Sequence, residues 1–440
     1  MSVFGEQLQE RLNTLLGKRL ASGLTLTGWR FDLHETEDLE VGVKNNKIGG
    51  PYTAPGLKQE SSGEICLHWE DEKYTIARIE RRVLEDFQAH LELWEKTAYK
   101  DPYGPELVKP YEPPAVPLAH EGATAILNGE FTPAFTYLAE GLEIMTGYGI
   151  NKVDGRVKIS RDRRLVANSE GLWVAYEQTP VQIYLGGDDL FGDVFAEKRL
   201  PDQEEFTGLA AYAGRTVREL KKRATLPREG EMAVILTPSV FEAFLEHYLL
   251  SNLSGRLVAN RQSAFAAQDF QEAKKVFRED LTISVDGTRP YRYSSYRCTG
   301  EGVPTGRADL VREGRLVTPV LTLKYAKKLG MEPTAIPVAG GYGLVIDLPQ
   351  RESFDGFLGE LEEGLIVYSV LGLHTQDYSA GKFSLVADQS LLVRKGQIQG
   401  KVETVIAGDF WQVLASEDTV FLDYPREETP AVCFRAHVAQ

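Results

Sequence analysis

Cysteine is scarce in this sequence, and long apolar runs are absent from it. The 440 residues include three cysteines, Cys66, Cys298 and Cys433, which lie far apart and form no C-x-x-C pair. This scarcity argues against a disulfide framework and fits a reducing compartment, so we expect a cytoplasmic protein. No stretch approaches the roughly 20 apolar residues that cross a bilayer, and the mixed charges of the N-terminal segment are not those of a signal peptide. We therefore expect no membrane partner.

Clustered positive charge is also lacking. Lys and Arg number 49 against 64 Asp and Glu, which gives a formal net charge of -15. The basic runs at 161–164 and 221–223 are short and have acidic residues close by. A protein that grips a phosphate backbone needs clustered Lys and Arg. We interpret these runs as solvated faces or turns, and expect no nucleic-acid partner.

The composition and length predict a multidomain α+β protein. Apolar residues make up 42% of the chain, which is ordinary for a globular protein. One region is rich in proline, a residue that fixes φ and removes backbone donors, and we interpret it as a linker or a strap over the surface. Its prolines are Pro102, Pro105, Pro110, Pro113, Pro114 and Pro117. We predict an N-terminal α/β domain at 1–117, a small central domain at 118–228, and a large, mostly antiparallel β-rich domain at 229–440.

Hydrophobic periodicity places the main elements. Apolar residues at helical spacing predict helices near 3–20, 80–99, 133–145 and 204–224, with another near 353–359. Alternating or continuous apolar runs predict strands at 24–27, 39–43, 64–69, 157–159, 172–176, 181–185 and 232–236. Two similar segments, at 310–316 and 392–398, each place a charged residue and a glycine between β-formers. This is hairpin chemistry, and it indicates that the last domain is one large sheet.

A helix predicted after Thr237-Pro238 carries the only helix-borne cluster of metal-ligand types. Ser239 and Glu242 have the S-x-x-E spacing of a capping box. A zinc peptidase helix needs two histidines about one turn apart and a Glu beside them. Glu246 and His247 are adjacent, so their side chains point about 100° apart and cannot both serve one ion. We interpret this segment as a capped, amphipathic structural helix.

A polar loop bounded by Gly372 and Gly381 is a second candidate. It contains His374, Thr375, Gln376 and Asp377, and loops of this kind often hold sites. Asp377 could orient His374, and these four residues are our candidate substrate-binding set. A turn with a solvated histidine explains the segment equally well, and both interpretations remain open.

Two further motifs favour structural roles. Cys298 has no identifiable base nearby, so we interpret it as structural rather than nucleophilic. The glycine-rich stretch Val338–Leu344 precedes a predicted strand. A phosphate cradle needs its glycines between a strand and a helix, so the order here is wrong.

The C-terminal motifs resemble those of a known family. Thr299-Gly300-Glu301-Gly302-Val303-Pro304-Thr305, followed by Leu310–Gly314, resembles the D-x-E-G-x-P-T … L-x-x-x-G segment of the TldD/PmbA family. Ser379-Ala380-Gly381-Lys382-Phe383-Ser384, followed by Lys395–Ile398, resembles that family's SG-x-FS … NG-x-I segment. The resemblance spans nearly the whole chain and is looser before these motifs.

This resemblance implies a role within a two-chain peptidase. TldD-type subunits carry H-E-x-x-x-H and a late cysteine that hold zinc, and they pair with a PmbA/TldE-type subunit that lacks these ligands. Together they form a cytoplasmic peptidase that trims unfolded or modified peptides, and members have also been called modulators of DNA gyrase. Here Phe241 and Glu246 stand at the histidine positions, Glu242 aligns with the Glu, and Cys433 lacks the Cys-Gly-Lys context. The resemblance therefore implies the zinc-free member, with no metal in this chain.

Three hypotheses follow. The first is a non-metal subunit of a heterodimeric zinc peptidase, with zinc on a TldD-like partner and an extended peptide as substrate. The second is a non-enzymatic, homo-oligomeric peptide-binding or adaptor protein. The third is a self-sufficient metallopeptidase that uses Glu246, His247 and His374 as unusual ligands. Zinc content and peptidase activity, alone and with a partner, separate them.

Overall fold

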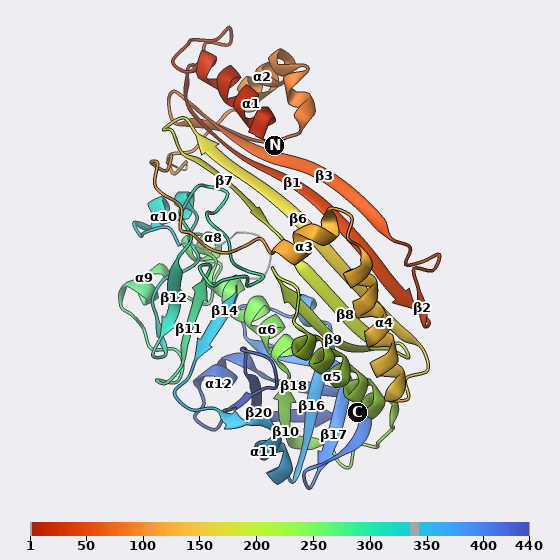
Figure 1. Ribbon diagram of the computed structural model, residues 1–440. Helices are drawn as coiled ribbons and strands as arrows, with labels where there is room; N and C mark the ends of the chain where they lie inside the picture. Colours follow the sequence, from red (N-terminus) through yellow and green to blue (C-terminus); the bar gives the residue numbers. More distant parts are fainter. Residues whose placement is uncertain (1, 105, 335–342, 440) are drawn as a thin grey trace.

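The computed structural model describes residues 2–104, 106–334 and 343–439, whose strands form three sheets (Figure 1). The first sheet has the strand order β5-β4-β3-β1-β6-β8-β9, with β2 paired to β1 and β7 to β6. Its strands are β1 Leu26–Lys44, β2 Lys47–Ile48, β3 Gly56–Trp69, β4 Lys73–Ile79, β5 Tyr99–Lys100, β6 Val153–Asn168, β7 Trp173–Gln178, β8 Val181–Gly187 and β9 Leu190–Glu197.

This sheet joins residues from both sides of the predicted boundary at 117. Strand β1 pairs antiparallel with β6 from Arg30 opposite Asn168 to Val43 opposite Gly155. The Pro-rich stretch runs between these strands in the sequence and is held against the rest of the chain as a strap. Asn168 donates to its Val108 carbonyl at 2.7 Å, and its Tyr111 donates to the Gly302 carbonyl at 2.9 Å. The Pro-rich stretch therefore lies beside one continuous sheet. The predicted boundary at 228 falls where the chain passes from helix α5 to another sheet.

Two groups of helices cover one face of the first sheet. Helices α1 and α2, with a short 3₁₀ turn at Arg81–Leu84, pack on one end, and α3, α4 and α5 pack on the other (Figure 1). These helices are α1 Ser2–Leu15, α2 Phe87–Lys96, α3 Glu121–Leu127, α4 Thr132–Gly147 and α5 Gln203–Lys221. Helix α5 begins with a capping box, in which Asp202 accepts from the Glu205 N–H and Glu205 accepts from the Asp202 N–H.

Each group of helices covers its own hydrophobic core, and a belt of polar residues on the sheet separates the two cores. This belt shows that one sequence prediction was wrong. The sequence indicated separate strands at 24–27 and 39–43, whereas β1 runs unbroken through both. The residues between them include Glu35 and Glu37, which stand opposite Arg163 and Arg161 of β6. The Arg161 Nη1 to Glu37 Oε2 distance is 2.9 Å. Cross-strand ion pairs thus replace apolar packing in the middle of the sheet, and the strand continues through them.

The second sheet closes on itself. Its order is β10-β16-β17-β18-β20-β19-β15, and β10 also pairs with β20, so that β10, β16, β17, β18 and β20 form a closed barrel. Its strands are β10 Gly230–Leu236, β15 Glu352–Ser353, β16 Glu363–Leu371, β17 Lys382–Arg394, β18 Gln397–Asp409, β19 Val420–Asp423 and β20 Ala431–Ala439. The barrel is antiparallel except for the pair β10–β16, and α5 packs on its outer face through Leu220 and Tyr212.

A small third sheet, β13-β12-β11-β14, lies beside the barrel. Its strands are β11 Thr282–Asp286, β12 Arg307–Arg312, β13 Arg315–Leu316 and β14 Leu344–Asp347. Both predicted hairpins are confirmed, with turns at Glu313-Gly314 and Lys395-Gly396 in which every residue has a positive φ. They lie in two sheets, however, and not in the single sheet that we predicted. The remaining helices are α6 Pro238–Phe244, α7 Ser251–Leu253, α8 Gly255–Ala259, α9 Ala267–Gln271, α10 Leu323–Leu329, α11 Phe354–Glu360 and α12 Phe410–Ala415.

Two further sequence predictions need a note here. The glycine-rich stretch that begins at Val338 lies, up to Tyr342, outside the described residues. Leu344 does begin a strand, β14, as predicted. In the part of the chain that the structure describes, no helix is long and apolar enough to span a membrane.

Candidate functional site

Helix α6 begins earlier than the sequence predicted. Thr237 is its N-cap residue and Pro238 occupies the first turn, where the missing proline N–H costs nothing. Ser239 and Glu242 therefore both lie inside the helix, and the predicted capping box is wrong. The Glu242 carboxylate instead accepts a hydrogen bond from the Thr429 hydroxyl. Thr237 donates to the Val367 carbonyl at 3.1 Å, which ties the helix start to β16.

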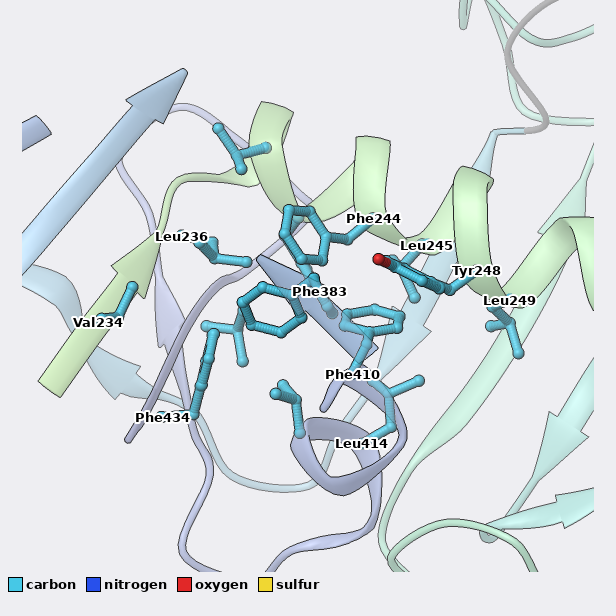
Figure 2. Close-up of a cluster of buried hydrophobic side chains, with 14 of the residues drawn as sticks. Val234, Leu236, Phe244, Leu245, Tyr248, Leu249, Phe383, Phe410, Leu414 and Phe434 are labelled. Carbon is cyan, nitrogen blue, oxygen red and sulfur yellow. The ribbon is translucent and has the colours of Figure 1, made fainter. Parts of the chain in front are cut away.

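One side of this helix is part of an aromatic core. Phe241 is 0% exposed, and its ring centroid lies 6.2 Å from that of Phe410 and 6.1 Å from that of Phe421. The helix continues as a π-helical segment, Leu245–Leu250. Figure 2 shows Phe244 and Tyr248 from this helix meeting Phe410 beneath it. Burial of several aromatic rings at once fixes which side of the helix faces the barrel.

The opposite side of the helix faces a cavity of about 740 Å³. The cavity lies between β9 and α5 of the first half of the chain and α6 and β16 of the second half, and Glu242 and Glu246 line it together. These two glutamates are four residues apart, so they share a helix face. Aromatic side chains form part of the wall, including Phe191, Phe195, Tyr212, Tyr293, Tyr368 and Tyr424.

Arginine and carboxylate groups form a connected network along one wall. Arg292 Nη1 lies 2.5 Å from Glu197 Oε1, and its Nη2 lies 3.1 Å from Glu428 Oε2. Arg289 also donates to Glu428, at 2.5 Å. Burial alone would raise the pKa of Glu428, but the hydrogen bond from Arg289 and the charge of Arg292 lower it. Arg426 pairs with Asp193 and lies over the Tyr212 ring, with its Cζ 5.0 Å from the centroid.

Several carboxyl groups in the same cavity have no ion pair with an arginine among the described residues, and three of these affect one another electrostatically: Glu242, Glu246 and Glu427. Burial raises the pKa of Glu242, and the charge of Glu246 adds to this effect. Burial raises the pKa of Glu427 to about 8, and the negative charges of Asp193 and Glu242 add to this increase. Ionised carboxyls that lie close together repel one another, and a cation placed among them reduces this repulsion. The cavity can therefore accept an ammonium or guanidinium group on this side.

Comparison with known proteins shows similarity to one family over the C-terminal part of the chain. Residues 229–433 match the family model described as the PmbA/TldA metallopeptidase C-terminal domain. A metalloprotease of Methanothermobacter thermautotrophicus is 25% identical over 276 residues, 58% of this chain and 59% of that protein. Metalloprotease PmbA of Escherichia coli O157:H7 is 29% identical over 214 residues, 46% of this chain and 44% of that protein. The family model and these relatives together support a place for this chain in the TldD/PmbA family. It spans about half the length of the curated relatives it matches.

The fold agrees with this family over nearly the whole chain. The crystal structure of TldE from Thermococcus kodakarensis matches with a TM-score of 0.81, covering 99% of this chain and 100% of that chain at 19% identity. This structural match supports the α+β fold. At such low identity it does not by itself assign a function.

The donor set of the TldD/PmbA helix in this chain does not fit zinc. A zinc site of the expected H-E-x-x-x-H type needs imidazoles at the positions of Phe241 and Glu246. Phe241 has no donor atom and points into the core, and Glu246 points into the cavity. Among the described residues, no group of three or more His, Cys, Asp and Glu side chains is arranged to hold a metal ion. His247, a ligand in our third hypothesis, instead places its Nε2 3.1 Å from the Gln376 carbonyl oxygen.

The predicted loop of substrate-binding residues lies apart from the cavity lining. His374, Thr375 and Asp377 are exposed at the end of β16, and Gln376 is half-buried. Asp377 does not orient His374, because its Oδ1 accepts from the Ser379 N–H at 2.9 Å and from the Ser379 hydroxyl at 2.7 Å. A short aspartate side chain readily bonds the backbone two residues ahead. Substrate binding by this loop stays a prediction.

The three cysteines are free and buried, which agrees with the prediction that the chain has no disulfide framework. Burial raises the pKa of the Cys298 thiol to about 12, and burial raises the pKa of Cys433 to about 12 as well. A thiol with such a pKa is protonated at neutral pH and is a poor nucleophile or metal ligand.

Sequence reasoning missed most of the cavity. Arg289, Arg292, Arg426, Glu427 and Glu428 come from two irregular segments that are far apart in the sequence. One signal was present: the Arg-Glu-Glu run that ends at Glu428 adds charge to a stretch between two apolar strands. Charge in a turn is common, however, and only the fold brings this run to α6.

Proposed function

We propose that this chain is the metal-free subunit of a two-chain TldD/PmbA-type peptidase, and that its cavity holds part of an extended peptide substrate. The observation that supports the proposal most strongly is the orientation of α6. Phe241 packs in the aromatic core where a zinc-bearing relative is expected to have a histidine, while Glu242 stays in the cavity. A chain that keeps the family helix and replaces its ligands with core residues retains the shape of the site without the metal.

The chemistry of the cavity suggests which peptides it takes. Glu242, Glu246 and Glu427 offer carboxyl groups that a bound cation would favour in their ionised form, and the tyrosine-lined wall offers apolar surface. We propose that the cavity binds a segment with a Lys or Arg side chain, or a free N-terminal ammonium, beside an apolar residue. Burial of a cation among carboxyls that otherwise repel one another is favourable because it removes that repulsion.

Co-purification tests the subunit role. We expect a zinc-bearing TldD-like chain from the same organism to form a complex with this chain and to cleave unfolded peptides. This chain alone should contain no stoichiometric zinc and should not cleave them. If the two chains never associate, and the zinc-bearing chain is fully active alone, the proposal is wrong. A homo-oligomer that binds peptide without any such partner would instead favour the adaptor hypothesis.

Peptide binding tests the cavity separately. We expect Glu246→Gln and Glu242→Gln to weaken the binding of a basic, labelled peptide by roughly 10-fold each, about 1.4 kcal/mol, because each removes a carboxyl group that would pair with the cation of the peptide. Glu10→Gln is the matched control, since this exposed carboxyl on α1 lies outside both the cavity lining and the loop of His374. Equal affinity for a basic and an acidic peptide of the same length would contradict the proposed charge preference.

A further inference from the structure

Half of strand β3 has an open edge. On one side, β3 pairs with β1 over its whole length, from Gly56 to Trp69. On the other side, β4 pairs only with Gly63–Trp69. Among the strands that the structure describes, none pairs with the outer side of Gly56–Ser62. Every residue of this segment is exposed, and Leu57 is 61% exposed. An open strand edge presents unpaired N–H and C=O groups that can join another strand.

The hydrogen bonds of β1 show which backbone groups point to this edge. The Trp29 carbonyl accepts from the Ser169 N–H on the β6 side at 2.9 Å, whereas the Gly42 N–H donates to Thr53 on the β3 side at 3.3 Å. Backbone direction alternates along a strand, so even-numbered residues of β1 face β3 and odd-numbered residues face β6.

The same alternation carries over to β3. Lys58 stands opposite Asp38 and Glu60 stands opposite Thr36, so the even-numbered residues of β3 bond to β1. The His68 carbonyl, which accepts from the Thr27 hydroxyl on β1, agrees with this direction. The odd-numbered residues Leu57, Gln59 and Ser61 therefore direct their N–H and C=O groups to the open edge.

This edge is complementary to itself about a two-fold axis at Gln59. Gln59 is the midpoint of Gly56–Ser62, so an antiparallel second copy can use the whole open edge of both chains. In that register Gln59 faces Gln59 of the second copy, and Leu57 faces Ser61 of the second copy. By symmetry, Ser61 also faces Leu57 of the second copy. These three pairs are all of the hydrogen-bonded kind, and together they supply about six hydrogen bonds.

The charges select this register. With the axis at Gln59, Lys58 faces Glu60 of the second copy in a non-hydrogen-bonded pair, where side chains approach most closely. Moving the axis to Lys58 would place two lysines opposite each other, and moving it to Glu60 would oppose two glutamates. Within one chain, Lys58 Nζ lies 2.5 Å from Glu60 Oε1, so both groups are on the same face of the strand. A lone lysine on an edge discourages pairing, but here each copy supplies its counter-charge.

We propose that two copies of this chain associate by antiparallel pairing of their Gly56–Ser62 edges, which joins the two first sheets into one. The interface is small, so its dissociation constant should be on the order of micromolar. The edge lies at the end of the sheet that carries β2, well away from α6 (Figure 1). This self-association is argued from the β3 edge alone and does not depend on the peptidase proposal, so the sedimentation test is made on this chain without a partner.

Charge reversal followed by rescue tests the register. In sedimentation velocity on the full chain at micromolar to hundred-micromolar concentrations, we expect a concentration-dependent dimer. Lys58→Glu and Glu60→Lys should each weaken it by at least roughly 10-fold, because each opposes two like charges twice per dimer. The double variant exchanges the two charges and should restore the dimer. A monomer at every concentration, or single variants that dimerise like the parent, would overturn the proposal.

Two substitutions at Gln59 locate the axis. Gln59→Pro removes an N–H that points outward, so it should abolish the dimer without changing the thermal unfolding of the chain. Gln59→Cys should form a disulfide-linked dimer on mild oxidation, because the Cα atoms of such a pair lie about 5.5 Å apart. Glu10→Cys, exposed on α1, is the control that should not cross-link. If the Gln59→Pro variant still dimerises and the Gln59→Cys variant does not cross-link, the contact lies elsewhere and the proposal is wrong.

Discussion

Phe241 and Glu242 are neighbours in the sequence, yet their side chains enter opposite environments. Phe241 is fully buried against Phe410 and Phe421, and Glu242 lines the cavity and accepts a hydrogen bond from Thr429. Adjacent helical residues point about 100° apart, so once one of them is fixed in the core the other must face away from it. The aromatic core thus determines what the site of this chain can hold.

Restoring the family motif should not restore a metal site. In the double variant Phe241→His with Glu246→His, we expect no stoichiometric zinc, because residue 241 stays on the core side of α6. Burial of an imidazole among aromatic rings should also lower the free energy of unfolding by at least about 2 kcal/mol. Metal analysis after dialysis and a urea titration measure both effects. One tightly bound zinc per chain in a stable protein would contradict this account.

Truncation of Phe241 should be costly for stability. Phe241→Ala removes a large buried side chain and leaves a cavity beside Phe410, so we expect a loss of about 3–5 kcal/mol in the free energy of unfolding. Phe241→Leu is the conservative control and should cost less than about 1.5 kcal/mol. Chemical denaturation of both variants checks the prediction. Equal, small effects would show that residue 241 is not held in the core.

Glu427 should make stability fall as pH rises. Its folded-state pKa is raised to about 8 from an ordinary 4.5, so the folded chain binds more protons than the unfolded chain between these values. The contribution of Glu427 to stability is therefore fully present below its ordinary pKa and is lost as the pH rises through about 8. Glu427→Gln removes this cost, and we expect it to raise the Tm relative to the parent at pH 9 but not at pH 5.

The exposed carboxylate of Glu10 provides the matched control for this pH series. Glu10→Gln should leave the difference in Tm between pH 5 and pH 9 unchanged. A Glu427→Gln variant with the same pH profile as the parent would mean that Glu427 ionises normally in the folded chain.

The ion pair of Asp32 with Arg164 should matter more than the surface pairs. Arg164 donates to Asp32 through Nε at 2.9 Å and Nη2 at 2.6 Å, and the two side chains are only 13% and 17% exposed. Asp32→Ala leaves a buried guanidinium unpaired, so we expect a loss of about 3–5 kcal/mol. Glu279→Ala, which breaks the exposed pair with Lys275, should cost far less, because solvent screens that pair.

Acid should remove the contribution of Asp32. Burial alone would raise its pKa, but the hydrogen bonds and charge of Arg164 lower it below the usual range. Its stabilisation is therefore present above the ordinary value near 3.8 and is lost as pH falls below it. The difference in unfolding free energy between the parent and Asp32→Ala should shrink on acidification below that value. A constant difference across the acid range would contradict the ion-pair explanation.

Elements that depend on local sequence could be predicted well. The turns at Glu313-Gly314 and Lys395-Gly396 need positive φ, and each lies in a predicted hairpin. Helices α4, α5 and α11 follow their apolar spacing. In each case the information lies within a few residues, where turn chemistry and periodicity act directly.

Features that depend on distant residues could not be predicted. The strands predicted at 24–27 and 39–43 left out Glu35 and Glu37, because nothing nearby shows that Arg163 and Arg161 stand opposite them. The pairing of β10 with β20 closes the barrel across most of the C-terminal half. Proline at the start of α6 also outweighed the S-x-x-E pattern, because it sets the first turn of the helix before Ser239.

The candidate site was found only in part. The sequence alone shows that the helix of Phe241, Glu242 and Glu246 lacks the zinc-type pattern, because helical spacing is a local property. It could not place Arg292 or Glu427 beside that helix, since they meet it only through the tertiary fold. The loop of His374 drew attention by its composition, although its Asp377 serves a local turn.

Zinc content, measured by elemental analysis together with peptidase activity, tests the central claim most directly. It should be compared for this chain purified alone and for its complex with a co-expressed TldD-like chain. We predict less than stoichiometric metal and no cleavage from the chain alone, and one zinc with peptide cleavage from the complex. A firmly held zinc in the isolated chain, with activity that disappears when the metal is removed, would contradict the account.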